Sequence, residues 1–249
     1  MSMPAIVELR LQPARPLQPA TRQLHGLACA LFEGTHSDDH LGHAKQFTIW
    51  PLHPDPDGWL LRAAWLAPSL PHSVLAACGQ LRLGPVTCTI SDLALRPAAH
   101  ADLASGPPLS EVQPTFHSPT FFSQNGAHVV LPDPRLIVGS WRRRWNASLP
   151  EQDPLTIDDD HWREIHQALH LAAFDLRTQS RDAGHGHDQP GFTGTTTLRL
   201  DKNASPAARR DFGTLARFAE FCGTGAQTTH GFGATSISAV YHRPPQDGT

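Results

Sequence analysis

The sequence has few of the features that mark a membrane-bound, secreted or strongly basic protein. It contains no run of about twenty apolar residues, the length that a membrane-spanning helix needs. The first residues, MSMPAIVELRLQP, lack the long apolar stretch of a secretory signal. The formal net charge is −3, whereas proteins that bind nucleic acid without regard to sequence are normally basic. We therefore expect a cytoplasmic chain with no membrane partner, in which any site for a polyanion is a local patch.

Cysteine and lysine are also scarce. The four cysteines form no C-x-x-C pair, so the sequence indicates neither a zinc knuckle nor a disulfide framework. The twenty basic residues comprise eighteen arginines and two lysines, Lys45 and Lys202. A retained lysine therefore points mildly to a position where arginine would not serve. Histidine is abundant at sixteen residues, which lowers the weight of any single one.

The first hundred residues predict a ferredoxin-like domain. Apolar residues at strand or helix spacing predict strands at 5–12, 46–52, 57–66 and 85–97 and helices at 20–34 and 73–79. The resulting order, β-α-β-β-α-β, is that of the ferredoxin-like fold. Its four-stranded sheet is also the frame of RNA-recognition modules. We place this domain at residues 1–100.

The rest of the chain predicts a linker and a second, more irregular domain. Residues 101–113 are rich in proline, alanine and serine without periodicity, which is typical of a domain boundary. Asn125-Gly126 is a hairpin signal. Helices are predicted at 135–146, 156–176 and 205–222, the last with Ser205 as its N-cap and Pro206 as its first residue. Strands are predicted at 191–200 and 234–241. The fold class is thus α+β, with two tandem ferredoxin-like (RRM-like) domains, the second at 114–249.

The stretch GTGAQTTHGFG at 223–233 is the most distinctive segment. It joins a predicted helix to a predicted strand, and its spacing fits neither G-x-G-x-x-G nor the phosphate-binding P-loop. One interpretation is a helix C-cap followed by a turn, which explains one or two glycines. The other is a backbone of exposed N–H groups able to hold an anion such as a phosphate. Four glycines in eleven residues favour the second.

Several segments together resemble the CRISPR repeat-processing endoribonucleases. GFTG at 191–194, ARFAEFCG at 216–223 and the glycine-rich loop are similar to the C-terminal half of that family. KQFTIWPL at 45–52 resembles its second N-terminal strand, and SPTFF at 118–122 and RRRWN at 142–146 are similar to its entry strand and following helix. The resemblance covers most of the chain, and the glycine-rich loop is its specific part.

The resemblance implies cleavage of CRISPR precursor RNA within each repeat, without a metal or another cofactor. The ribose 2′-OH attacks the adjacent phosphorus, which gives a 2′,3′-cyclic phosphate and a 5′-hydroxyl. Histidine suits both proton transfers because its unperturbed pKa is about 6.5. His36, His40 and His43 precede the matching strand; the family spacing favours His40, then His43, as catalytic residues, with Lys45 as the matching lysine.

The resemblance also implies where RNA binds. Many family members carry a tyrosine in the first helix, whereas the one tyrosine here is Tyr241, so that role is vacant or filled by His25. HGHD at 185–188 is read as a surface loop and not as a metal site. The predicted RNA-binding residues are Gly223, Gly225, Gln227, Thr228, Thr229, His230, Gly231, Gly233, Arg142, Arg143 and Arg144.

Three functions remain open at this stage. The first is the metal-independent endoribonuclease, with repeat RNA and subunits of a CRISPR effector complex as candidate partners and no DNA. The second is a non-catalytic RNA-binding subunit of the same superfamily, which has no need of the cluster of His40, His43 and Lys45. The third, a small-molecule enzyme that holds a nucleotide in the glycine-rich loop, is disfavoured by the motif spacing.

Overall fold

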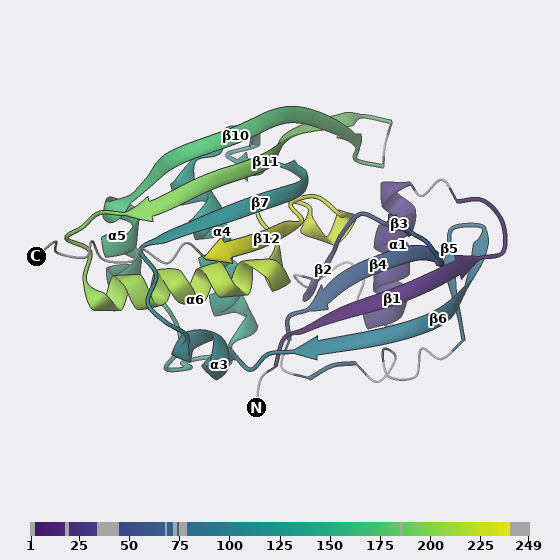
Figure 1. Ribbon diagram of the computed structural model, residues 1–249, viewed down its shortest axis with the longest axis horizontal. Helices are drawn as coiled ribbons and strands as arrows, with labels where there is room; N and C mark the ends of the chain where they lie inside the picture. The colour runs from purple at the N-terminus through teal and green to yellow at the C-terminus, as the bar shows by residue number, and fades with distance from the viewer. Residues whose placement is uncertain are drawn as a thin grey trace, which may run out of the picture.

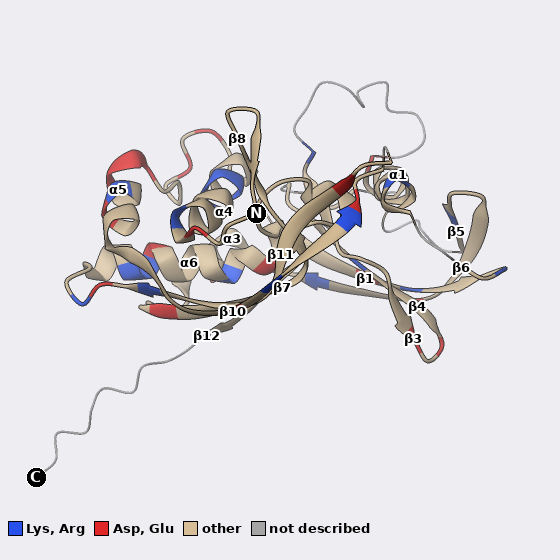
Figure 2. Ribbon diagram, turned by 90° about the horizontal axis from the view of Figure 1, so that it is seen from above, with Lys and Arg blue, Asp and Glu red and all other residues tan. Residues whose placement is uncertain are grey.

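The computed structural model describes residues 3–17, 20–33, 45–67, 69–71, 74, 79–184 and 186–239. Two antiparallel sheets lie next to each other along one side of the molecule, and most of the helices lie along the other (Figures 1 and 2). Within the described ranges, no helix is both long and apolar enough to cross a membrane.

The N-terminal sheet has the ferredoxin-like strand order. Its order is β2-β4-β1-β6-β5, with the short strand β3 paired to β4. The helix α1 (Thr21–Phe32) packs its apolar face, Leu24, Leu27, Ala28 and Leu31, into the core beneath this sheet. The strands are β1 (Ala5–Pro13), β2 (Phe47–Ile49), β3 (His53–Asp55), β4 (Gly58–Trp65), β5 (Gln80–Leu83) and β6 (Val86–Pro97). The helix expected at 73–79 lies mostly outside the described residues.

The C-terminal sheet repeats this arrangement. Its order is β10-β11-β7-β12. When the short strands β3 and β5 of the first sheet are set aside, the four main strands of each sheet lie in the order second, third, first, fourth along the chain. The prediction of two tandem ferredoxin-like domains is confirmed. The strands and helices are α3 (His100–Ser105), β7 (Glu111–Thr120), β8 (Phe122–Gln124), β9 (Ala127–Val129), α4 (Pro134–Ser148), α5 (Asp159–Ala168), β10 (Leu169–Asp182), β11 (Asp188–Leu200), α6 (Pro206–Cys222), the 3₁₀ helix η1 (Thr228–His230) and β12 (Thr235–Ala239).

The second domain is the more irregular one, as predicted. A separate hairpin of β8 and β9 follows the first strand, and two helices, α4 and α5, stand where the first domain has α1. The hairpin turns at Asn125-Gly126, where both residues have positive φ. The division at 101–113 stays a prediction; α3 and the start of β7 fall within or beside that range.

The predicted helix over 156–176 is wrong in its second half. The helix α5 ends at Ala168, and the chain continues directly as β10. Leu169, Ala172, Ala173 and Leu176 have helical spacing, but residues 169–182 pair along their whole length with β11. Phe174, in the same strand, is 66% exposed. Pairing with the next strand, β11, outweighs a local apolar period that serves no buried helical face.

The two domains share a packed seam. Each has its own apolar core, but Ile6, Ala64 and Leu66 of the first domain pack into the core of the second. At the same seam the Thr48 hydroxyl donates a buried hydrogen bond of 2.7 Å to the carbonyl of Phe221, near the end of α6. The N-terminal sheet is thereby fixed against the helix that leads into the glycine-rich loop.

Candidate nucleic-acid interface

The glycine-rich loop begins directly after α6. Ser205 caps this helix by accepting a hydrogen bond from the N–H of Ala208, and Pro206 is its first residue, as predicted. Gly223 ends it at φ 63°. All four loop glycines, 223, 225, 231 and 233, have positive φ, a conformation that glycine adopts without steric cost.

Two of these glycines also allow very close backbone contacts. A Cβ on Gly225 would stand 2.2 Å from the carbonyl oxygen of Phe121, and one on Gly233 would stand 1.8 Å from that of Thr224. Real Cβ atoms do not come so close to a carbonyl oxygen. The loop is therefore folded back against itself and against the end of β7, with no space for a side chain.

This folding corrects the expectation of an open row of N–H groups. The N–H of Thr224 donates to Gly233, that of Ala226 to Phe121, and that of Gly233 to Pro119, at 2.8, 2.8 and 3.1 Å. The N–H of Gly225 donates to the Ser140 hydroxyl at 3.2 Å. These four donors are used inside the protein. What the loop presents outward is its apex, where Gln227 is exposed and Thr229 and His230 are partly exposed.

Helix α4 supports the loop from inside the protein. The Trp141 indole N–H donates to the Thr224 hydroxyl at 2.8 Å. The Arg144 guanidinium donates to the carbonyls of Gly225, at 2.7 Å, and Gly223, at 3.4 Å. Burial lowers the pKa of Arg144. Sequence reasoning missed Ser140 and Trp141, because nothing in the chain marks residues more than eighty positions apart as partners.

The three consecutive arginines point in different directions, as expected for neighbouring helical positions. Arg142 donates to the Ile157 carbonyl and pairs with Asp159 at 2.7 Å. Arg143 is exposed, and within the described ranges it has no hydrogen bond or ion pair. Figure 2 shows blue, basic positions on α4, which lies on the helical side of the molecule. A role in RNA binding remains a prediction for all three, and Arg143 is the one free to make it.

The contacts of Arg144 predict a structural effect. Replacing Arg144 by methionine should lower the free energy of unfolding by about 1.5–3 kcal/mol, the usual range for hydrogen bonds to a charged group. The matched control, Arg143→Met, should stay within about 0.5 kcal/mol of the parent. Urea denaturation followed by tryptophan fluorescence measures both. Equal stabilities of the two variants would mean that Arg144 does not support the loop.

Helix α1 meets the apex of the loop through two histidines. The rings of His25 and His230 stack with centroids 3.9 Å apart and planes 6° from parallel. Because a carbonyl only accepts, the 2.9 Å contact between His25 Nδ1 and the Thr229 oxygen places a proton on Nδ1. The other nitrogen, Nε2, lies 3.5 Å from the Cys29 sulfur. Burial is the main reason why the pKa of Cys29 is raised to about 11.

Of the predicted catalytic residues, Lys45 is the one that the structure describes, and it lies at the C-terminal end of α1. Lys45 forms hydrogen bonds of 2.7 and 2.8 Å with both carboxylate oxygens of Glu33, directly after α1. The strand β2, which begins two residues after Lys45, packs against η1 of the loop. His36, His40 and His43 lie in the segment 34–44, outside the described residues. The Lys45–Glu33 pair thus joins the two residues that flank this segment.

The hairpin of β10 and β11 forms a third side of this interface. Arg181 donates to the Gly231 carbonyl at 3.0 Å, and its guanidinium lies 5.9 Å from the centre of the Phe232 ring. Burial lowers the pKa of Arg181. Next to it, the Thr21 hydroxyl at the start of α1 donates to the Asp182 carbonyl at 2.6 Å. Sequence reasoning missed this contact because Thr21 and Asp182 are 161 positions apart and no local signal marks them as partners.

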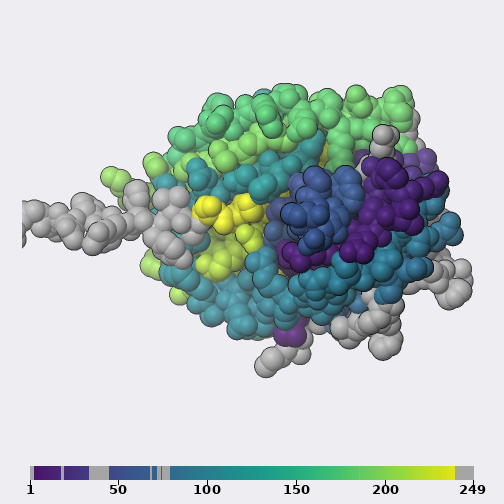
Figure 3. Space-filling view, turned by 45° about the vertical axis from the view of Figure 1, so that its right-hand side comes forward, coloured from purple at the N-terminus to yellow at the C-terminus, as the bar shows by residue number. Residues whose placement is uncertain are grey.

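The interface therefore combines segments from both ends of the chain. Figure 3 shows the N-terminal residues, in purple and blue, next to the C-terminal residues, in yellow, on one face of the molecule. Among the described residues, no group of three or more His, Cys, Asp or Glu side chains is placed to hold a metal ion. The described side chains at this interface carry imidazole, hydroxyl, amide, ammonium, guanidinium and carboxylate groups.

Three comparisons bear on what this interface does. Residues 115–235 match the family model described as "CRISPR-associated endoribonuclease Cas6". A protein of that name from Mycobacterium tuberculosis (strain CDC 1551 / Oshkosh) is 32% identical over 131 residues, which span 51% of this chain and 39% of that protein. The matched stretch is thus well under two thirds of the length of the relative.

Solved structures match over almost the whole chain. A Cas6 product complex is 29% identical with a TM-score of 0.81, covering 96% of this chain and 100% of the other. A structure of Thermus thermophilus Cas6 is also 29% identical, with a TM-score of 0.76 and coverage of 96% and 99%. The resemblance inferred from the sequence is confirmed by these comparisons.

Proposed function

We propose that this chain, a relative of the CRISPR repeat-processing endoribonucleases, binds CRISPR precursor RNA at the seam of α1, β2 and the glycine-rich loop and cleaves it within the repeat. The observation that carries the proposal is that Cys29 of α1 lies between two groups of side chains. Its sulfur is 3.5 Å from Nε2 of His25, which stacks on His230, and it is also a neighbour of the Lys45–Glu33 ion pair. Imidazoles and a lysine are the groups that proton transfer and charge stabilisation at a phosphate require.

The reaction needs no metal in this proposal. One histidine removes the proton of the ribose 2′-OH, and the resulting oxyanion attacks the adjacent phosphorus in line. A second acid protonates the departing 5′-oxygen, which leaves a 2′,3′-cyclic phosphate and a 5′-hydroxyl. We assign one of these two proton transfers to His40, with His43 as the second candidate for that role. The ammonium of Lys45 stabilises the negative charge that develops on the phosphorane oxygens.

The RNA contacts of the loop are assigned to its apex. Gln227, Thr229 and His230 face outward, whereas the neighbouring N–H groups are bonded inside the protein. His25 stacks on His230 and holds one side of the apex. We propose that His25 acts in the place where many family members carry a tyrosine, through this stacking and through its Nε2.

The two lysines of the chain provide a matched test of one role. Lys45→Ala should slow cleavage by roughly tenfold or more, because it removes an ammonium whose attraction to the phosphate oxygens is stronger in the transition state than in the ground state. Some loss of repeat affinity should accompany it, since the same charge attracts the phosphate in the ground state. Lys202→Ala, an exposed lysine after β11, is the control. Equal cleavage rates of the two variants would contradict the role of Lys45.

The reaction itself is tested with excess chelator. The purified chain, incubated with its host's repeat RNA and EDTA, should yield a single cut within each repeat with a 2′,3′-cyclic phosphate end. Binding without cleavage would favour the non-catalytic RNA-binding function. Cleavage that stops on chelation and returns with Mg²⁺ would contradict the metal-independent mechanism.

A further inference from the structure

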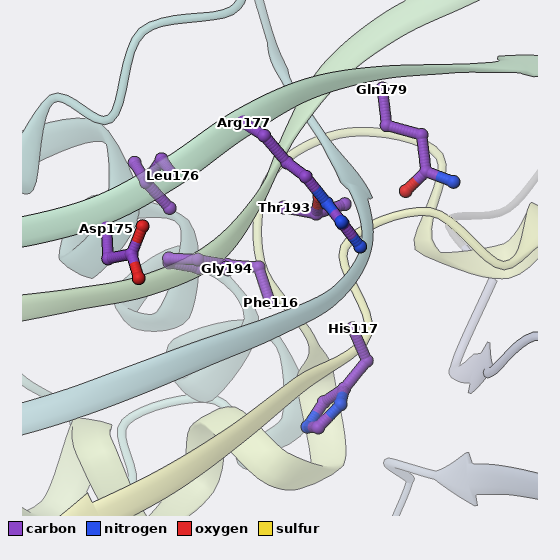
Figure 4. Close-up of a pocket in the computed structure, with 8 residues that line it drawn as sticks. All are labelled: Phe116, His117, Asp175, Leu176, Arg177, Gln179, Thr193 and Gly194. Carbon is purple, nitrogen blue, oxygen red and sulfur yellow. The ribbon is translucent and has the colours of Figure 1, made fainter.

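A polar trough of about 400 Å³ lies on the C-terminal sheet, outside the interface described above. The central strand β11 forms its floor at Thr193 and Gly194. Asp175, Arg177 and Gln179 of β10 line one side. On the other side stands His117 of β7 (Figure 4).

At Gly194 the floor has no side chain, and only glycine fits that position. Gly194 has φ 117°, and a Cβ there would stand 2.2 Å from the carbonyl oxygen of Asp175. The strand pairing also shifts register between Phe192 and Gly194. A planar group can therefore lie directly against the backbone between the two walls. Gly194 ends the GFTG stretch, to which the proposed cleavage reaction assigns no role.

The β10 wall carries an acceptor and a donor that do not pair with each other. Asp175 and Arg177 are two residues apart in a strand, so their side chains stand on the same face roughly 6–7 Å apart. Within the described ranges, the Asp175 carboxylate has no ion pair or hydrogen bond, and Arg177 makes one long contact of 3.4 Å to the Thr193 hydroxyl. Both charged groups are exposed and free to bind a ligand.

The opposite wall is a fixed aromatic ring. His117 Nε2 lies 2.7 Å from the Ser236 hydroxyl, and the ring stacks on Trp50 with centroids 5.0 Å apart. Burial, and then the neighbouring charges of His53 and Arg62, lower the pKa of His117. The imidazole is therefore neutral at neutral pH, and it offers the trough a polar edge without a positive charge.

We propose that this trough binds one unpaired guanine base. Guanine carries N–H donors on its Watson–Crick edge, which Asp175 accepts, and the acceptors O6 and N7 on the edge beside it, to which Arg177 donates. Adenine would place its N6 amino group where the arginine needs an acceptor. The proposal extends the function above, because the RNA contains such bases; a free guanine nucleotide presents the same base.

Binding of short oligonucleotides tests this. Fluorescein-labelled UUGUUU should bind the full chain roughly tenfold more tightly than UUAUUU, within the range expected for one bidentate base contact. Asp175→Asn and Arg177→Gln should each abolish the preference. Asp188→Asn, an exposed carboxylate on the same hairpin, should retain it. Fluorescence anisotropy measures all of these affinities without any cleavage.

Equal affinities for the two oligonucleotides, no measurable binding of either, or a preference that survives both trough variants would overturn the proposal. Competition by GMP distinguishes the sources: displacement of UUGUUU shows that the free nucleotide is a ligand, and its failure shows that the RNA chain is needed. Neither oligonucleotide contains a repeat. Cleavage of repeat RNA without a guanine preference would therefore contradict this inference alone. A guanine preference without cleavage of repeat RNA would contradict the proposed function alone.

Discussion

Replacing His40 by alanine is expected to slow cleavage of repeat RNA by roughly two to four orders of magnitude, the usual contribution of a positioned acid or base. Affinity for the repeat should stay within a few fold. The two effects separate because the histidine acts on a proton in transfer, whereas affinity for a nucleic acid comes mainly from phosphate and base contacts. Single-turnover cleavage and filter binding, performed on the same preparations, measure them.

A control for this result is His170→Ala. His170 lies near the start of β10, beside Asp201, at the opposite end of that strand from the contact with α1. It should cleave at the parent rate. If His43→Ala loses activity and His40→Ala does not, the active residue is misplaced but the mechanism stands. If both single variants and the double variant keep the full rate, residues 34–44 do not hold the catalytic group.

The structure supports this prediction through the residues that flank the segment. Glu33 and Lys45 form an ion pair with both side chains less than 20% exposed. Close by, α1 and β2 both pack against η1 of the glycine-rich loop. Glu33 and Lys45, the two residues on either side of 34–44, are therefore both neighbours of Cys29, whose sulfur lies 3.5 Å from the ring of His25.

The strands β1, β2, β4 and β6 and the helix α1 of the first domain followed from local patterns of apolar residues. The helix α6 was predicted to the residue at its start, because Ser205 and Pro206 are local signals that a capped helix uses. The β10 strand was not predictable in this way. Its residues 169–176 have helical spacing, and only pairing with β11, which lies beyond a turn, makes them a strand.

The candidate site likewise has features that the sequence predicts and features that it does not. Positive φ at the loop glycines was predictable because only glycine adopts it readily. The supporting contacts were not, because Trp141 and Arg181 reach the loop from residues 83 and 50 positions away. A single sequence contains no signal for pairs at that distance. The direction of the loop N–H groups, inward and not outward, depends on those same contacts.

Replacing Gly225 by alanine should destabilise the protein far more than replacing Gly126. The two glycines have nearly the same φ, 78° and 79°. The left-handed backbone conformation should therefore cost alanine the same free energy at both positions, about 1–2 kcal/mol. Around Gly126 nothing lies within 4 Å of the new Cβ, whereas at Gly225 the Phe121 oxygen stands 2.2 Å away. Relieving that clash should cost about 1–3 kcal/mol more, as in an overpacked site.

Urea denaturation of Gly225→Ala and Gly126→Ala measures the difference directly. Displacement of the loop should also weaken repeat binding in the first variant, because the N–H of Ala226 donates to the same Phe121 oxygen and holds the approach to the apex. Binding is compared in conditions where both variants are folded. Equal losses of stability in the two variants would show that the loop relaxes around a methyl group at position 225. Gly225 would then be required for its φ alone, and the tight packing of the loop would not position its apex.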